Sequence, residues 1–250
     1  MAFNDPFATA QNQAQTRAIE MDAGLRSYML KIYNYMASAL ALTGVVAMFT
    51  ANSAAMQGAL YRTNEMGQMV GQSGLGLLVM FAPLVMVLVM SFGQNRLSVT
   101  GLQACYWGFA TLMGLSLSSV FLMYTGESIA RVFFITAATF GGMSLYGYTT
   151  KRDLSGMGSF LMMGLIGLII ASVVNIFLKS SALSFATSVI GVLIFVGLTA
   201  YDTQKLKTMY YQLVGTGEMM AKASIMGALS LYMDFINIFL YMLRFFGERR

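Results

Sequence analysis

The chain has 250 residues, of which 57% are hydrophobic and only 10% are charged. A soluble domain carries about 25% charged residues, so this composition predicts an integral membrane protein. The net charge of +5 is small and spread along the chain, which excludes a dense basic surface for nucleic acid. There are no histidines, and the single cysteine, Cys105, lies in an apolar run. Imidazole metal sites, Ser-His and Cys-His catalytic pairs and an internal disulfide are therefore excluded.

The chain begins with a polar segment and continues with apolar stretches. Residues 1–28 lack the apolar core of a signal peptide, and we expect a cytoplasmic tail with a surface helix from Thr16 to Arg26. About 20 apolar residues in a helix span the hydrocarbon of a bilayer, so residues 29–246 predict an all-α domain of seven transmembrane helices. The expected helices are 29–51, 74–92, 99–123, 129–149, 156–178, 183–208 and 223–246, followed by a short tail at 247–250.

The distribution of Lys and Arg predicts the orientation in the bilayer. With a cytoplasmic N-terminus, more Lys and Arg fall on the cytoplasmic side than on the outer side. Arg244, Arg249 and Arg250 would fit better inside if the last segment were re-entrant, which leaves a six-span alternative open. A full crossing is favoured because residues 228–246 are long and apolar enough to span.

The last expected helix carries a carboxylate near its middle, Asp234. A charged side chain at mid-membrane costs about 2.5–3.5 kcal/mol on insertion scales, so it is normally paired or faces a wet cavity. Spacings of three and four residues place Ser230, Asp234, Asn237 and Tyr241 on one stripe of the helix. This helix is therefore expected to turn its polar groups inward.

A second acid, Asp202, lies on the preceding helix after Tyr201, with Thr199 on the same face. The two helices are expected to be antiparallel neighbours, with both acids in the cytoplasmic half. Two carboxyl groups in contact at low dielectric do not both ionise cheaply, so we expect them to share one proton. Loss of that proton would create a doubly negative site that attracts a cation with oxygen ligands, such as Ca²⁺.

Each acid also has a structural interpretation when taken alone. Asp202 is explained as an interfacial carboxylate offset by Lys205, and Asp234 as a hydrogen-bond anchor to another helix. Their matched depth on consecutive helices favours a functional pair.

The sequence resembles a known family at these acids. Residues 228–239 (ALSLYMDFINIF) and 243–247 (LRFFG), with Tyr201-Asp202 and the turn 151–155 (KRDLS), are similar to a bacterial branch of the Bax inhibitor family, the transmembrane Bax-inhibitor-motif proteins. The resemblance implies a seven-helix bundle with the C-terminal helix at its centre, in a bacterial inner membrane. It also implies a pH-sensitive calcium leak rather than an enzyme. Asp202 and Asp234 would be the pH sensor and transient Ca²⁺ ligands, with Ca²⁺ and H⁺ as permeant or bound ions and no cofactor.

The resemblance implies supporting residues and a second function. Basic residues near the end of the second helix contact the acid pair in the family, and Arg96 is the candidate here. Arg244 matches an arginine that pairs with an acid of the second helix, but residues 74–92 contain no Asp or Glu. Some bacterial members modulate a membrane-bound AAA+ protease without transport, a role that the polar N-terminal tail could serve.

An intramembrane aspartyl protease is the enzymatic alternative. Those proteases place Tyr-Asp on one spanning helix and Gly-x-Gly-Asp on the next. Tyr201-Asp202 fits the first motif, but the residues before Asp234 are Leu-Tyr-Met and contain no glycine. This difference disfavours proteolysis.

Overall fold

The computed structural model describes residues 6–64 and 69–249. Seven of its helices are long and apolar enough to cross a membrane, the candidate span within the first being Met21–Asn52. The prediction of an all-α membrane protein with seven transmembrane helices is confirmed. Two short strands form an antiparallel hairpin beside the end of the first helix. The helices are α1 (Pro6–Asn52), α2 (Ala54–Leu60), α3 (Gly74–Gly93), α4 (Val99–Met123), α5 (Gly126–Thr149), α6 (Ser155–Leu178), α7 (Ser181–Leu213) and α8 (Gly217–Phe246), and the strands are β1 (Tyr61–Thr63) and β2 (Met69–Gln72).

Polar residues in the loops set where several helices begin. At the starts of α3, α4, α5 and α7, a Ser or Thr side chain accepts a hydrogen bond from the backbone N–H three residues later. These residues are, in order, Ser73, Ser98, Thr125 and Ser180. Such N-caps satisfy donors that the first helical turn leaves without a partner. The hydrophobic stretches thus predict the spans, and the caps explain their first residues.

The connection between α7 and α8 is shorter than expected. Helix α7 continues to Leu213 and α8 already begins at Gly217, so the loop predicted between residues 208 and 223 is a tight turn. Gly215 occupies this turn with a φ of 88°, a conformation that glycine adopts at little cost. Residues 209–213 and 217–222 therefore extend the two helices instead of forming a loop.

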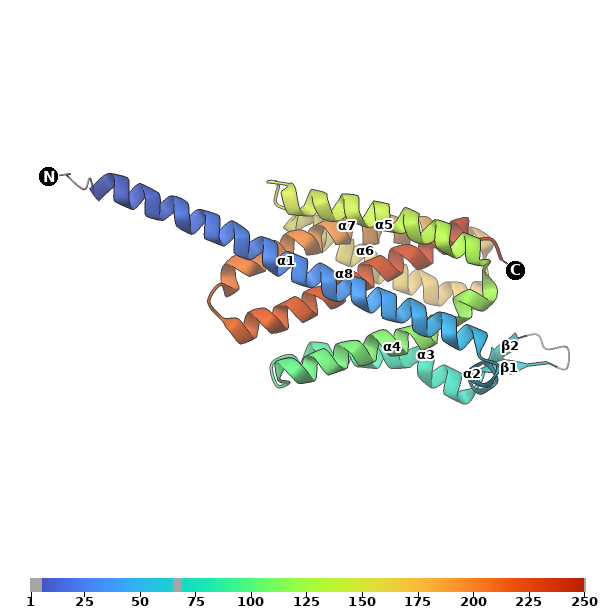
Figure 1. Cartoon of the computed structure of the whole chain (residues 1–250). Helices are drawn as coiled ribbons and strands as arrows, with labels where there is room; N and C mark the ends of the chain where they lie inside the picture. The colour runs from blue at the N-terminus through green and yellow to red at the C-terminus, as the bar shows by residue number, and fades with distance from the viewer. Residues whose placement is uncertain (1–5, 65–68, 250) are drawn as a thin grey trace.

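Helix α1 also extends further than expected. The sequence predicts a polar tail over residues 1–28 with a helix only from Thr16, whereas α1 runs unbroken from Pro6, and residues 1–5 lie outside the described part of the chain. Its N-terminal part projects beyond the ends of the other helices (Figure 1). Among side chains from Met21 onward, Leu25 is the first to be buried, and Gly24 before it lies against the Tyr210 ring of α7.

The C-terminal tail is held against the opposite end of the bundle. Arg249 forms an antiparallel β-bridge with Tyr124, and the backbone N–H of Glu248 donates to Ser128 Oγ (2.9 Å). Arg250 lies outside the described residues.

The last helix is the most buried of the seven spans. In its most apolar stretch 67% of the residues are buried, against 6% in α6. Helix α8 packs against α1, α4, α5 and α7, whereas α3 packs mainly on α4 and α6 on α7 (Figure 1). Its expected position at the centre of all six other spans stays a prediction.

A closely packed polar core joins α8 to α1 and α4. Thr43 Oγ1 donates to the Ala110 carbonyl (2.8 Å) and accepts from the Tyr232 hydroxyl (2.7 Å). Gly114 of α4 lies directly against the backbone of Thr43. With no side chain at Gly114, the two helices approach closely enough for these hydrogen bonds to form.

Candidate functional site

A cavity of about 830 Å³ lies between α3, α6, α7 and α8. Its lining is mostly apolar and rich in methionine, and both predicted acids, Asp202 and Asp234, contribute to it. The neighbouring helices α3 and α6 supply its outer walls. The lining methionines are Met162, Met209, Met219, Met226 and Met233.

Asp202 enters this cavity from α7 and is held by the neighbouring helix. Its Oδ2 accepts a hydrogen bond from Ser230 Oγ of α8. Lys205, one turn later on α7, also lines the cavity and is near enough to act electrostatically on Asp202. The Lys205 Nζ lies 5.9 Å from the centroid of the Tyr201 ring. Asp202 therefore has both a hydrogen-bond donor and a nearby cation.

Asp234 is the more deeply buried acid and is less well satisfied. Its side chain is 4% exposed and lines the same cavity, yet its Oδ2 has no hydrogen-bond partner within the described residues. Asp202 lies close enough to interact electrostatically with the Asp234 carboxyl group. An unpartnered buried acceptor is uncommon, because it loses its bonds to water without replacement. Asp234 is thus poised to receive a proton or a cation.

The structure brings the two acids to one cavity, but a direct bond between them is not present. Across residues 6–64 and 69–249, no hydrogen bond is found between the carboxyl groups of Asp202 and Asp234, and the partner of Asp202 Oδ2 is Ser230. The shared proton therefore stays a prediction.

The stripe predicted on the last helix faces the cavity along its length. Ser230, Asp234, Asn237 and Tyr241 all line it. Asn237 Nδ2 donates to the carbonyl of Met233 (2.8 Å), one turn earlier on α8. Helical spacing alone was sufficient to group these four residues, because they lie on one helix.

Two predicted residues of α7, Thr199 and Tyr201, are not among the residues that line the cavity. Thr199 is fully buried, and its Oγ1 donates to the Phe195 carbonyl (2.8 Å) within its own helix. The Tyr201 ring packs on Gly158 of α6. Both side chains contribute to helix packing beside Asp202.

The two predicted arginines are not brought to the acids. Arg96 is exposed in the turn after α3 and does not line the cavity, whereas Gln94 and Asn95 of the same turn do. Arg244 is exposed near the end of α8, with its guanidinium 5.7 Å from the Tyr241 ring centroid. In the described part of the chain, Arg244 forms no ion pair, in keeping with the lack of an acid in α3.

Two lysines are cavity residues that the sequence did not identify as such. The sequence explains Lys205 as the neighbour of an interfacial acid and places Lys222 before the predicted start of the last helix at residue 223. Both line the cavity, and Lys222 Nζ pairs with Glu218 Oε1 one turn earlier (2.9 Å). The spacing of Glu218 and Lys222, four residues apart, is the signal for an earlier helix start.

The described residues place only two carboxylates at the cavity, those of Asp202 and Asp234. Within the described residues, no group of three or more His, Cys, Asp or Glu side chains is placed to hold an ion. Ca²⁺ takes six to eight oxygen ligands, so two carboxylates leave most of its coordination to water. The arrangement suits a cation that passes or binds transiently.

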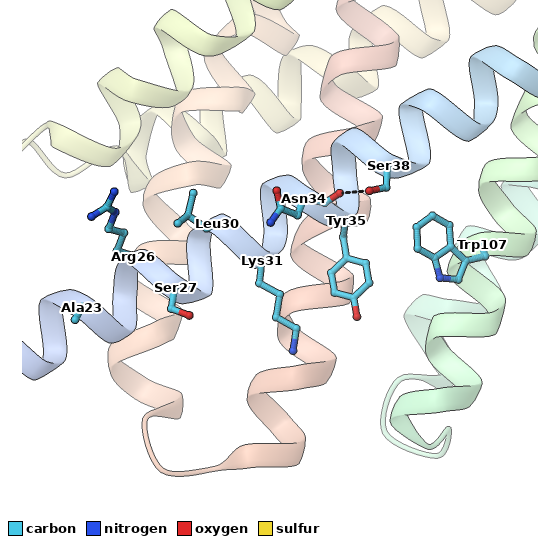
Figure 2. Close-up of a pocket in the computed structure, with 9 residues that line it drawn as sticks. All are labelled: Ala23, Arg26, Ser27, Leu30, Lys31, Asn34, Tyr35, Ser38 and Trp107. Carbon is cyan, nitrogen blue, oxygen red and sulfur yellow. Dashed lines mark hydrogen bonds between the residues drawn. The ribbon is translucent and has the colours of Figure 1, made fainter.

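A second hollow, on the outside of α1, has different chemistry. It measures about 760 Å³ and lies beside α4, where Tyr35 and Trp107 approach with ring centroids 6.3 Å apart. Figure 2 shows Lys31 and Tyr35 extending from one side of α1 and Arg26 from the other. Cationic and aromatic side chains of this kind are typical of a membrane–water interface. No carboxylate is among the lining residues described, and Arg26 and Lys31 bring positive charge to this groove.

The chain is similar over nearly its whole length to known proteins. The sequence model of a family described as "Inhibitor of apoptosis-promoting Bax1" matches residues 25–250. Protein RP147 of Rickettsia prowazekii is 55% identical over 229 residues, which are 92% of each chain. A protein of Caulobacter vibrioides is 51% identical over 93% of this chain and 92% of its own. The inner membrane protein YbhL of Escherichia coli K12 is 49% identical over 93% of this chain and 96% of its own.

Proposed function

Because these matches confirm that the chain belongs to the Bax inhibitor family, we propose that it is a pH-sensitive calcium-leak channel of a bacterial inner membrane. The observation that carries the proposal is the cavity between α3, α6, α7 and α8, into which both Asp202 and the unpartnered Asp234 project. No enzymatic activity is part of the proposal.

The charge of the acid pair would control the passage of cations. When one proton is bound, the pair carries a single negative charge that Lys205 balances locally. When that proton is lost, two carboxylates face one cavity and repel each other, and a divalent cation relieves the repulsion. Flux of Ca²⁺ is therefore expected to rise as the pH increases.

The other charged groups around the acid pair do not neutralise it completely when both acids are ionised. Lys205 and Lys222 line the cavity, but Lys222 is already paired with Glu218. Ser230 stabilises the negative form of Asp202 by donating a hydrogen bond. One cation, Lys205, is thus left to offset two acids when both are ionised.

The test is Ca²⁺ flux into liposomes, measured against pH, for the wild type and for Asp202→Asn and Asp234→Asn. Each substitution removes one charge of the pair, and we expect flux that no longer depends on pH. Asp153→Asn is the matched control, because Asp153 is an exposed acid of the α5–α6 turn. A wild-type pH profile in both cavity variants would overturn the proposal.

A second candidate function is modulation of a membrane-bound AAA+ protease. The observation that favours it is the N-terminal part of α1, which extends beyond the bundle as a helix and offers a surface away from the membrane spans (Figure 1). Deleting residues 1–20 would abolish co-purification with the protease while leaving Ca²⁺ flux intact. Unchanged co-purification would argue against this function.

A further inference from the structure

We propose that the cavity between α3, α6, α7 and α8 also binds amphipathic organic cations, which carry an ammonium or phosphonium charge on an apolar body. Such a ligand would enter from the bilayer and place its charge against Asp234. The proposal concerns the same cavity as the calcium path but does not require ion flux.

The lining suits the apolar body of such a ligand. A volume of about 830 Å³ lies within the range of small-molecule sites. Methionine is flexible and polarizable, so a methionine-rich wall adapts to ligands of different shapes. The rings of Phe195 and Tyr241 add aromatic surface on which a cation can also rest. A hydrated Ca²⁺ ion gains nothing from these apolar contacts, whereas an amphipathic cation does.

The unpartnered acid supplies the attachment point for the charge. Asp234 is buried, faces the cavity, and has an Oδ2 without a hydrogen-bond partner in the residues described. Asp202, by contrast, is bonded to Ser230 and lies near Lys205. A bulky, weakly hydrated cation can reach a buried carboxylate with little loss of solvation. Asp234 is therefore the residue on which affinity should depend most.

The cavity borders α6, a candidate membrane span in whose most apolar stretch only 6% of the residues are buried. Ile169 and Met162 of α6 line the cavity, yet their side chains are 56% and 49% exposed. Helix α6 packs mainly on α7 and α3 mainly on α4, and both of these outer helices line the cavity. A ligand dissolved in the bilayer can thus reach the cavity sideways.

An anionic lipid with its headgroup on Lys205 and Lys222 is the alternative occupant. Both lysines already have partners, since Lys222 pairs with Glu218 and Lys205 lies over the Tyr201 ring. Asp234 Oδ2 has none. The charge left unsatisfied inside the cavity is negative, which favours a cation.

The test compares two probes of the same shape and opposite charge, tetraphenylphosphonium and tetraphenylborate, with the protein in nanodiscs and empty nanodiscs as background. We expect saturable binding of tetraphenylphosphonium and none of tetraphenylborate. Asp234→Asn should weaken phosphonium binding by about tenfold or more, because it removes a charge contact that is shielded from water. Asp153→Asn should bind as the wild type does.

Met233→Trp gives a second, charge-neutral test, because it fills the cavity and should also weaken binding while thermal unfolding shows the protein to be folded. Equal phosphonium affinity in the wild type and Asp234→Asn would overturn the proposal. Saturable tetraphenylborate binding that is lost in Lys205→Gln and Lys222→Gln would also overturn it, in favour of an anionic lipid. Phosphonium binding is measured without Ca²⁺. A protein that conducts Ca²⁺ but does not bind phosphonium therefore rejects this inference and leaves the proposed channel function intact. Binding without flux rejects only the channel.

Discussion

Among the polar residues that α8 buries, Tyr232 and Asp234 differ in how their polar atoms are satisfied. They are two positions apart, so they point to nearly opposite sides of the helix. Tyr232 is fully buried, its hydroxyl bonds Thr43 at 2.7 Å, and its ring meets Phe109 edge-on with centroids 5.1 Å apart. Asp234 is almost as buried, but its Oδ2 has no partner among the described residues. Burial alone therefore does not distinguish these two residues, whereas hydrogen-bond satisfaction does.

The two sides of α8 differ in packing as well. On the Tyr232 side, glycine lets α4 approach α1 at backbone distance, and little space remains. On the Asp234 side, methionines surround an open volume of about 830 Å³. We expect the first side to respond to substitution through stability and the second through binding and flux.

The largest expected effect is that of added volume on the closely packed side. A Cβ at Gly114 would lie 2.8 Å from the Thr43 carbonyl oxygen and 2.7 Å from Val46 Cβ, so Gly114→Leu must push α1 and α4 apart. We expect a loss of about 3 kcal/mol or more in the free energy of unfolding, at the upper end for overpacked cores. The measurement is denaturation of the purified protein in detergent.

Gly141→Leu is the matched control, because Gly141 is exposed on α5 and a Cβ there would meet no atom within 4 Å. It should unfold close to the wild type. If Gly114→Leu and Gly141→Leu lower the free energy of unfolding equally, close packing at Gly114 is not the cause of the loss.

A smaller loss is expected when the polar core is broken without added volume. Thr43→Val removes the acceptor of the Tyr232 hydroxyl and leaves that buried group without a partner, which costs about 1–3 kcal/mol. The double variant Thr43→Val/Tyr232→Phe removes the orphaned hydroxyl and should recover part of the loss. The free energies of unfolding of the wild type, both single variants and the double variant form a double-mutant cycle that measures this interaction. A double variant no more stable than Thr43→Val would show that the hydroxyl is satisfied elsewhere.

Most of the fold could be predicted from the sequence, because hydropathy and helical spacing act within one helix. The span 99–123 coincides with α4, and the stripe from Ser230 to Tyr241 lines one cavity as a set. Contacts between helices depend on how each helix is rotated and shifted against its neighbours, which one-dimensional spacing does not contain. For this reason neither the bond from Ser230 to Asp202 nor the exposed position of Arg96 could be predicted.

The smallest expected change in stability is that of Asp234→Leu, on the cavity side of α8. Leucine removes a buried carboxylate that has no hydrogen-bond partner in the described structure, and the adjoining cavity has room for the larger side chain. We expect the free energy of unfolding to change by less than about 1 kcal/mol, or to rise, because removal of an unsatisfied polar group offsets any loss of fit. Denaturation alongside Thr43→Val measures the difference directly. A loss as large as that of Thr43→Val would mean that Asp234 anchors α8 to another helix, and its open Oδ2 would then no longer support a role in binding cations.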